Sequence, residues 1–177
     1  MELSVYFESD INGTSLKHFY EKVVPKLSEA TRLNLYINSS GGAVALALAL
    51  ARFIEKLQGE VWTYNAGHCD SAAVVLFAAG RVRVVNGQQS SFFVHEVRKE
   101  VQGLHSIKTL ESELKILRRD TRDITSFLER RTKRKQGLWE RDMKKGIVFG
   151  GERAVRMRLA TKKIEFSVFD MENLIKI

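Results

Sequence analysis

The sequence has only one cysteine and one proline, and it has no long apolar run. The single cysteine excludes an internal disulfide and favours an intracellular, cytoplasmic location. The longest apolar stretch, residues 43–51, is far shorter than the roughly 20 residues of a membrane-spanning helix, so we expect no membrane segment. Residues 1–7 alternate in polarity without a basic start, so we expect no signal peptide.

The composition is that of a globular protein, with 44% hydrophobic and 28% charged residues. We therefore expect a single domain over residues 1–177. Twenty-nine basic residues against 21 acidic ones give a net charge of +8. Many of the basic residues gather in 118–122 and 130–135, where cations suit a solvated helix face near its C-terminus. No nucleic-acid motif accompanies them, so a nucleic-acid partner is not expected.

The first half of the chain alternates strand-like and helix-like patterns. Strands are predicted at 3–7, 32–38, 60–67, 81–87 and 91–97, and helices at 13–27, 43–59 and 71–79. Pro25 should kink or end the first helix, and Gly59 should stop the second, which is apolar nearly all round and so is expected to be buried. Such alternation predicts an α/β fold with a mostly parallel sheet.

The second half begins with a polar connector and a long charged helix, predicted over 107–135. Its apolar stripe is narrow, which is typical of a helix that projects from the body and packs on a partner, often another copy of itself. A helix, a short strand and a last helix follow, and residues 162–170 are predicted to form a terminal strand.

The segment NSSGG, residues 38–42, lies between a strand and a buried helix. Its two glycines permit backbone angles that other residues avoid, and they leave N–H groups bare at a helix start. The segment is consistent with an oxyanion hole or with a plain tight turn.

Ser71 lies at the start of the next predicted helix, after GHCD. A serine there is either an N-cap or a nucleophile whose neighbour Ala72 offers a backbone N–H to an oxyanion. Asp70 would cap the helix equally well, so capping does not require Ser71.

His95 ends the apolar strand SFFV and can present its imidazole to a cleft, or it can be a satisfied core histidine. His18, His68 and His105 fall in a predicted helix, a turn and a connector. One cysteine without a spaced set of histidines does not favour a metal site, and we expect no cofactor.

Together these three segments resemble the proteolytic subunit of the Clp protease family. That family carries NSPGG after a strand, a G-x-A-x-S-M-G segment, and a hydrophobic-H-Q-P segment after a further strand. Here they read LYINSSGG, GHCDSAAVVLFAAG and FFVHEV, and the resemblance runs from about residue 3 to about 160. It implies a ClpP/crotonase-like stack of strand–helix repeats, with a head over about 1–96 and 138–177 and a projecting handle over about 97–137.

The resemblance also implies a function. Ser71 becomes the nucleophile, His95 the general base, and the N–H groups of Gly42 and Ala72 the oxyanion hole. The chain would be a serine peptidase that cleaves peptides or unfolded protein inside a homo-oligomer of stacked, seven-fold rings. The family's pore-forming segment, which helps to engage an ATPase unfoldase, would precede Leu3. Whether this chain has such an unfoldase partner is therefore left open.

The sequence departs from the family at the third member of the triad. The family's E-R-D-x-x-R-D pattern aligns with ERDMKKG, which places Gly146 at the catalytic aspartate. The third member is therefore unknown. Four carboxylates are near enough in sequence to substitute for it: Asp142, Glu140, Asp70 and Glu96. Alternatively, a Ser71–His95 dyad works slowly, or the chain is a catalytically impaired paralogue with a structural or regulatory role in an oligomer.

Two further alternatives come from other chemistry. A crotonase-like acyl-CoA enzyme shares the strand–helix plan and uses backbone oxyanion donors. Cys69 is a second possible nucleophile, provided that its thiol pKa is lowered.

Overall fold

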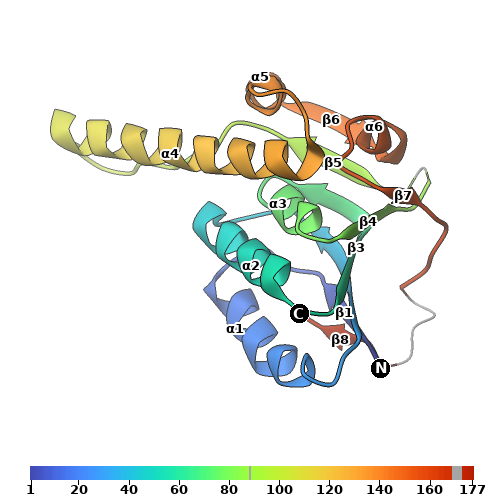
Figure 1. The fold of residues 1–177 in the computed structure, drawn as a ribbon. Coiled ribbons are helices and arrows are strands. Elements are labelled where there is room, and N and C mark those ends of the chain that lie inside the picture. Colours follow the sequence, from blue (N-terminus) through green and yellow to red (C-terminus); the bar gives the residue numbers. More distant parts are fainter. Residues whose placement is uncertain (88, 169–172) are drawn as a thin grey trace.

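A single eight-stranded sheet organises the chain in this computed structural model, which describes residues 1–87, 89–168 and 173–177 (Figure 1). The main path runs β6-β5-β3-β2-β1-β8, while β4 pairs with β3 and β7 pairs with β4. Every pair is parallel except β5–β6, which confirms the mostly parallel sheet. The strands are β1 (Glu2–Phe7), β2 (Arg32–Ser39), β3 (Glu60–Asp70), β4 (Val82–Val85), β5 (Ser91–Val94), β6 (Ile147–Gly150), β7 (Lys162–Lys163) and β8 (Ile175–Lys176).

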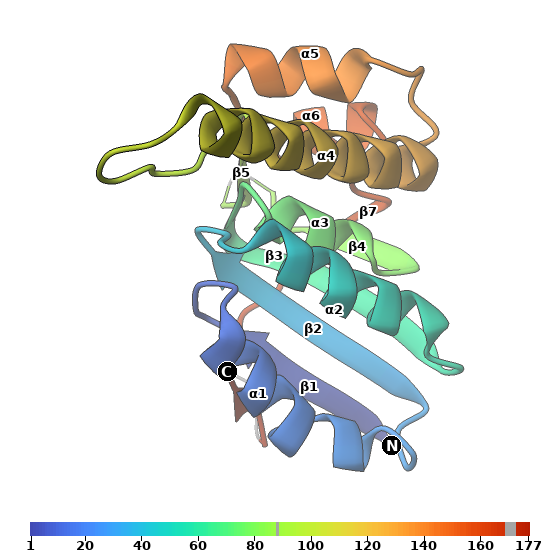
Figure 2. The same ribbon diagram turned by 90° about the vertical axis from the view of Figure 1, so that its left-hand side faces the viewer.

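Three helices, α1 (Gly13–Lys22), α2 (Val44–Lys56) and α3 (Ala73–Ala78), lie on one side of this sheet (Figures 1 and 2). α1 starts at Asn12, whose side chain accepts hydrogen bonds from two backbone N–H groups of the first turn. It ends before a 3₁₀ turn that contains Pro25, as predicted.

Two predictions about α2 need correction. The helix ends at Lys56 because Leu57 is extended, so Gly59 is not its stop. Gly59 instead belongs to the entry into β3, where a Cβ would lie 3.0 Å from the Thr31 carbonyl oxygen. The prediction that α2 is buried nearly all round is also wrong. Ala45, Ala49 and Arg52 are exposed, and only the face of the helix toward the sheet is buried.

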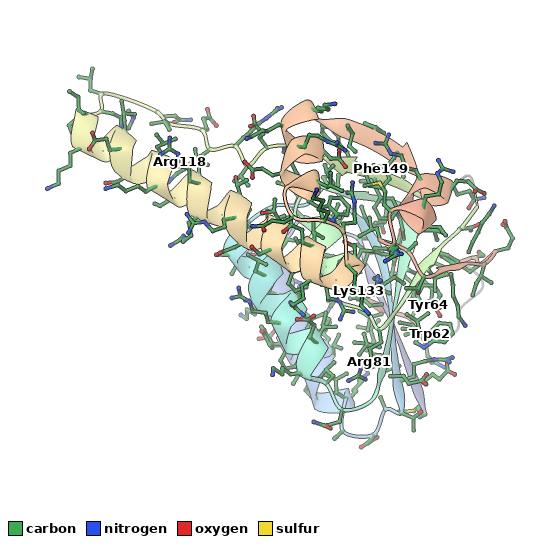
Figure 3. The ribbon with its side chains drawn as sticks, turned by 45° about the horizontal axis from the view of Figure 1, so that its top comes forward. Trp62, Tyr64, Arg81, Arg118, Lys133 and Phe149 are labelled. Carbon is green, nitrogen blue, oxygen red and sulfur yellow. The ribbon has the colours of Figure 1, made fainter. Side chains whose placement is uncertain are left out.

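The opposite side of the sheet carries an aromatic cluster. Tyr6, Tyr36 and Tyr64 lie in register on β1, β2 and β3, and the rings of Tyr36 and Tyr64 stack with centroids 4.3 Å apart. Trp62 lies beside Tyr64 on the same strand (Figure 3), and Phe166 covers the tyrosines from the C-terminal segment. The sheet is thus buried on both faces, which suits parallel strands.

The long helix α4 (Ile107–Thr132) is half packed and half free. Its second half buries Ile124 and Leu128 against the head, whereas residues Ile107 and Leu114 are 79% and 46% exposed. Figure 1 shows the first half extending past the sheet, and Figure 3 places Arg118 on it, which confirms the predicted projecting helix.

The C-terminal third continues with α5 (Leu138–Lys145), β6 and α6 (Gly151–Arg156). The predicted terminal strand over 162–170 is mostly wrong, since only Lys162–Lys163 pair as β7 and 164–168 form no strand; residues 169–170 lie outside the described residues. Instead Ile175–Lys176 adds to the edge at β1. Among the described residues, no helix is both long and apolar enough to cross a membrane.

Candidate active site

Ser71 lies in a sharp turn between β3 and α3. Its φ is +52°, a left-handed conformation that is uncommon for a residue with a side chain and costs on the order of 1–2 kcal/mol. The turn is held by the Ser71 N–H, which donates to the Phe93 carbonyl at 2.7 Å. β3 extends through Asp70, so His68 lies in a strand and not in the predicted turn. That segment pairs with β5, a tertiary contact that its own polarity does not reveal.

The capping role for Ser71 is wrong. α3 starts after Ala72, and no side chain forms a capping hydrogen bond there. The Ser71 Oγ forms no hydrogen bond with any residue in 1–87, 89–168 or 173–177 and is therefore available for chemistry. The Ala72 N–H has no acceptor within the same residues.

The glycine turn after β2 lies directly against Ser71. Gly41 has φ +100°, and a Cβ on it would lie 2.6 Å from the Asp70 carbonyl oxygen and 2.9 Å from the Ser71 Cβ. Gly42 has φ +137°, and a Cβ there would lie 2.4 Å from the Ile11 carbonyl oxygen. Both positions therefore require glycine.

Hydrogen bonds around this turn leave one donor unused. The Ile11 N–H donates to the Gly41 carbonyl at 2.6 Å, and the Ala43 N–H donates to the Ile11 carbonyl at 2.8 Å. The Gly41 N–H donates to the Ser39 Oγ at 3.2 Å. Within the described part of the chain the Gly42 N–H has no acceptor, as expected of an oxyanion donor.

We expect Gly42→Ala to destabilise the fold by about 3 kcal/mol or more, because it adds an overlap with the Ile11 backbone to a strained φ. Urea denaturation measures this. Gly13→Ala is the matched control, since a Cβ on Gly13 meets nothing within 4 Å; it should change the stability by less than about 1 kcal/mol. Equal stability of the two variants would contradict the described turn.

His95 directly follows β5, the strand that pairs with the end of β3. Its Nδ1 lies 2.7 Å from the Glu96 carbonyl oxygen. Since a carbonyl only accepts, Nδ1 carries the proton and Nε2 is left as a basic nitrogen. The Phe93 ring lies beside the imidazole, with centroids 4.9 Å apart.

Gly42, Ser71 and His95 line one small pocket of about 90 Å³. The remaining walls are mostly apolar, with Arg98 as the charged exception. They comprise Val44, Val94, Val97, Arg98, Ile124, Leu128 and Met143. These wall residues could not be identified from the sequence, although the apolar stripe on α4 contains two of them, at i and i+4 spacing.

The position aligned with the family's aspartate, Gly146, carries no acid. β5 and β6 are antiparallel, and their pairing ends with Val94 opposite Ile147, so His95 and Gly146 are the next residues on the two segments. Gly146 ends α5 with φ +62°, and a Cβ on it would lie 3.9 Å from the Phe93 ring.

The four carboxylates considered as substitutes differ in their surroundings. Asp142 is buried and held by Arg134 at 2.8 Å, while Glu140 pairs with Lys144. The Glu96 side chain is exposed, and only its backbone carbonyl contacts His95.

Asp70 is the fourth carboxylate, and its Oδ1 is buried without a hydrogen-bond partner in the described residues. Burial raises the pKa of the Asp70 carboxyl, while attraction to His68, hydrogen bonding to the Phe93 backbone and attraction to His95 act in the opposite direction.

Cys69 faces the core, fully buried, with Sγ 3.7 Å from the Ile37 carbonyl oxygen. Burial raises the pKa of its thiol well above the ordinary value, and the Asp70 charge adds to this effect. Both features argue against the Cys69 nucleophile, because thiolate chemistry needs a lowered pKa and access.

Comparisons with known proteins agree with this geometry. The family model for Clp protease matches residues 2–165. No curated protein sequence matches the chain. Among solved structures, a mutant of ClpP1 from Listeria monocytogenes superposes with a TM-score of 0.81 over 92% of this chain and 91% of that chain, at 17% identity, which shows the shared fold. The family match includes the glycine turn, Ser71 and His95. On this evidence the chain belongs to the Clp protease family.

Proposed function

We propose that the chain is a serine peptidase subunit of a self-compartmentalising, Clp-like protease that hydrolyses peptides or unfolded protein. The main support is that three groups meet in one pocket: a strained Ser71, a Gly42 N–H that has no acceptor among the described residues, and the His95 imidazole. Family membership favours this chemistry over the acyl-CoA alternative.

In the proposed mechanism His95 Nε2 takes the proton of the Ser71 Oγ as the oxygen attacks the substrate carbonyl carbon. The N–H groups of Gly42 and Ala72 hold the resulting oxyanion, each contributing a few kcal/mol. The imidazolium then gives its proton to the leaving amine, and the C–N bond breaks. Water, activated by His95, hydrolyses the Ser71 ester and releases the acid.

The pocket walls support a preference for an apolar side chain before the cleaved bond. Val44, Ile124, Leu128 and Met143 provide them, and burying an apolar side chain there is favourable. A larger groove of about 970 Å³ between α4 and α5 shares Val97 with this pocket and offers room for the rest of a peptide.

Oligomerisation is part of the proposal. The free half of α4 exposes Ile107, Leu110 and Leu114, an apolar stripe that a second copy would cover. Together with family membership this supports stacked, seven-fold rings of identical subunits. The reduced, buried Cys69 fits a cytoplasmic location.

The alternative is a catalytically impaired paralogue with a structural or regulatory role in an oligomer. The observation that favours it is Gly146, which leaves no carboxylate at the position aligned with the family's aspartate.

Hydrolysis of fluorogenic peptides by the assembled protein separates the two functions. We expect cleavage after leucine or methionine at least about tenfold faster than after aspartate or lysine, because a charged side chain loses hydration in the pocket. A complete lack of cleavage by a preparation that light scattering shows to be oligomeric would favour the impaired paralogue.

A further inference from the structure

Asp70 directly precedes the proposed nucleophile and lies beside Phe93, whose ring contacts the proposed base. It pairs with Phe93 in the β3–β5 register, and side chains paired in this way lie on the same face of a sheet. The His95 ring lies against the Phe93 ring on that face. His68, two residues before Asp70 on β3, shares the same face. The buried Oδ1 of Asp70 has no hydrogen-bond partner in the described residues.

We propose that Asp70 is a positioning residue for His95, and that its carboxylate stabilises the imidazolium that forms when His95 takes the serine proton. This inference rests on the proposed peptidase function. In this proposal Asp70, at the end of β3, supplies the negative charge that Gly146 does not provide.

The Glu96 carbonyl and the Asp70 carboxylate would then have different roles, the first in fixing the His95 tautomer and the second in stabilising the imidazolium. The Glu96 carbonyl accepts the Nδ1 proton and fixes the tautomer, but a neutral carbonyl brings only a partial charge. Asp70 supplies a full charge in a partly buried place, where water screens it less than it screens the exposed Glu96 side chain.

The other charged groups on the segments next to His95 are mostly cationic. β3 contributes His68 besides Asp70, and the segment after β5 contributes Glu96 and Arg98. α5 ends with Lys144 and Lys145. α4 brings only apolar side chains to the pocket, Ile124 and Leu128. Because these neighbouring segments carry more cations than anions, removal of the Asp70 charge should make the protonated form of His95 less stable.

A partly buried carboxylate that serves to stabilise the His95 imidazolium should lower the stability of the folded protein. Burial raises the pKa of Asp70 in the folded state, so ionisation of this carboxyl lowers the free energy of unfolding at pH values above its ordinary pKa of about 4. Below that pH the carboxyl is protonated in both states and the loss of stability disappears. Asp70→Asn should therefore raise the melting temperature at pH 7 but not at pH 3.5. An aspartate that only supports the fold would show the opposite change at pH 7.

The test measures the titration of His95 directly. Diethyl pyrocarbonate modifies neutral imidazole, so its rate at His95 against pH, read by peptide mass spectrometry, gives the midpoint of titration in the assembled protein. In Asp70→Asn we expect this midpoint to move to lower pH by about one unit, with kcat/KM for an apolar peptide reduced about tenfold. The exposed His105 provides an internal reference that should not move.

Asp10→Asn is the matched control, since Asp10 is exposed and should leave both the midpoint and the rate unchanged. An unmoved His95 midpoint in Asp70→Asn would overturn the inference, as would a lower rate accompanied by a lower melting temperature at pH 7. If the wild type cleaves no peptide but the midpoint moves, the peptidase function fails while the Asp70–His95 coupling stands.

Discussion

Ser71→Ala is expected to lower kcat for peptide hydrolysis by at least about 10³-fold, since it removes the attacking oxygen. The change should not disturb the fold. The Ser71 Oγ has no hydrogen bond within the described chain, and alanine meets the same strain at φ +52° as serine does. Unfolding free energies of the two proteins should agree within about 0.5 kcal/mol.

Ser40→Ala is the control for this prediction. Ser40 precedes the glycine turn and is exposed, so its loss should leave hydrolysis unchanged. If Ser71→Ala also retained full hydrolysis, Ser71 would not be the nucleophile, and the assignment of the pocket as the catalytic site would be wrong.

Gly146→Asp should raise the rate of hydrolysis, by on the order of 10²-fold. Loss of the orienting aspartate in serine proteases costs on the order of 10⁴, and here the Glu96 carbonyl already orients His95 in part. Gly146 directly precedes Ile147, the partner of Val94, and a Cβ on Gly146 would contact Phe93 at an ordinary 3.9 Å. Aspartate tolerates the left-handed conformation better than most residues.

Gly146→Asn separates charge from shape in this experiment. Both variants carry the same backbone cost, about 1 kcal/mol relative to glycine, but only aspartate brings a charge. We expect kcat to rise in Gly146→Asp alone. An equal effect of the two variants would mean that a carboxylate at this position does not act on His95.

The sequence predicted much of the fold because its periodic patterns are strong. Strands and helices alternate up to β4, and right-handed parallel connections bring the ends of successive strands to one edge of the sheet. The glycine turn, Ser71 and His95 each follow a strand, so their meeting could be expected from the order of elements alone.

What the sequence did not reveal depends on contacts between distant segments. His68 was predicted to lie in a turn, whereas pairing with β5 keeps it in β3. The pocket walls come partly from α4, whose docking is not visible from its own stripe. The partnerless Asp70 oxygen becomes apparent only when the neighbouring strand is in place.

The central claim is that His95 activates Ser71 although Gly146 provides no acid. The most direct measurement is the intact mass of the assembled protein after treatment with a fluorophosphonate, for the wild type, Ser71→Ala and His95→Ala. The account predicts one adduct in the wild type and none in either variant. An assembled wild type that forms no adduct, or an adduct that persists in Ser71→Ala, would contradict it.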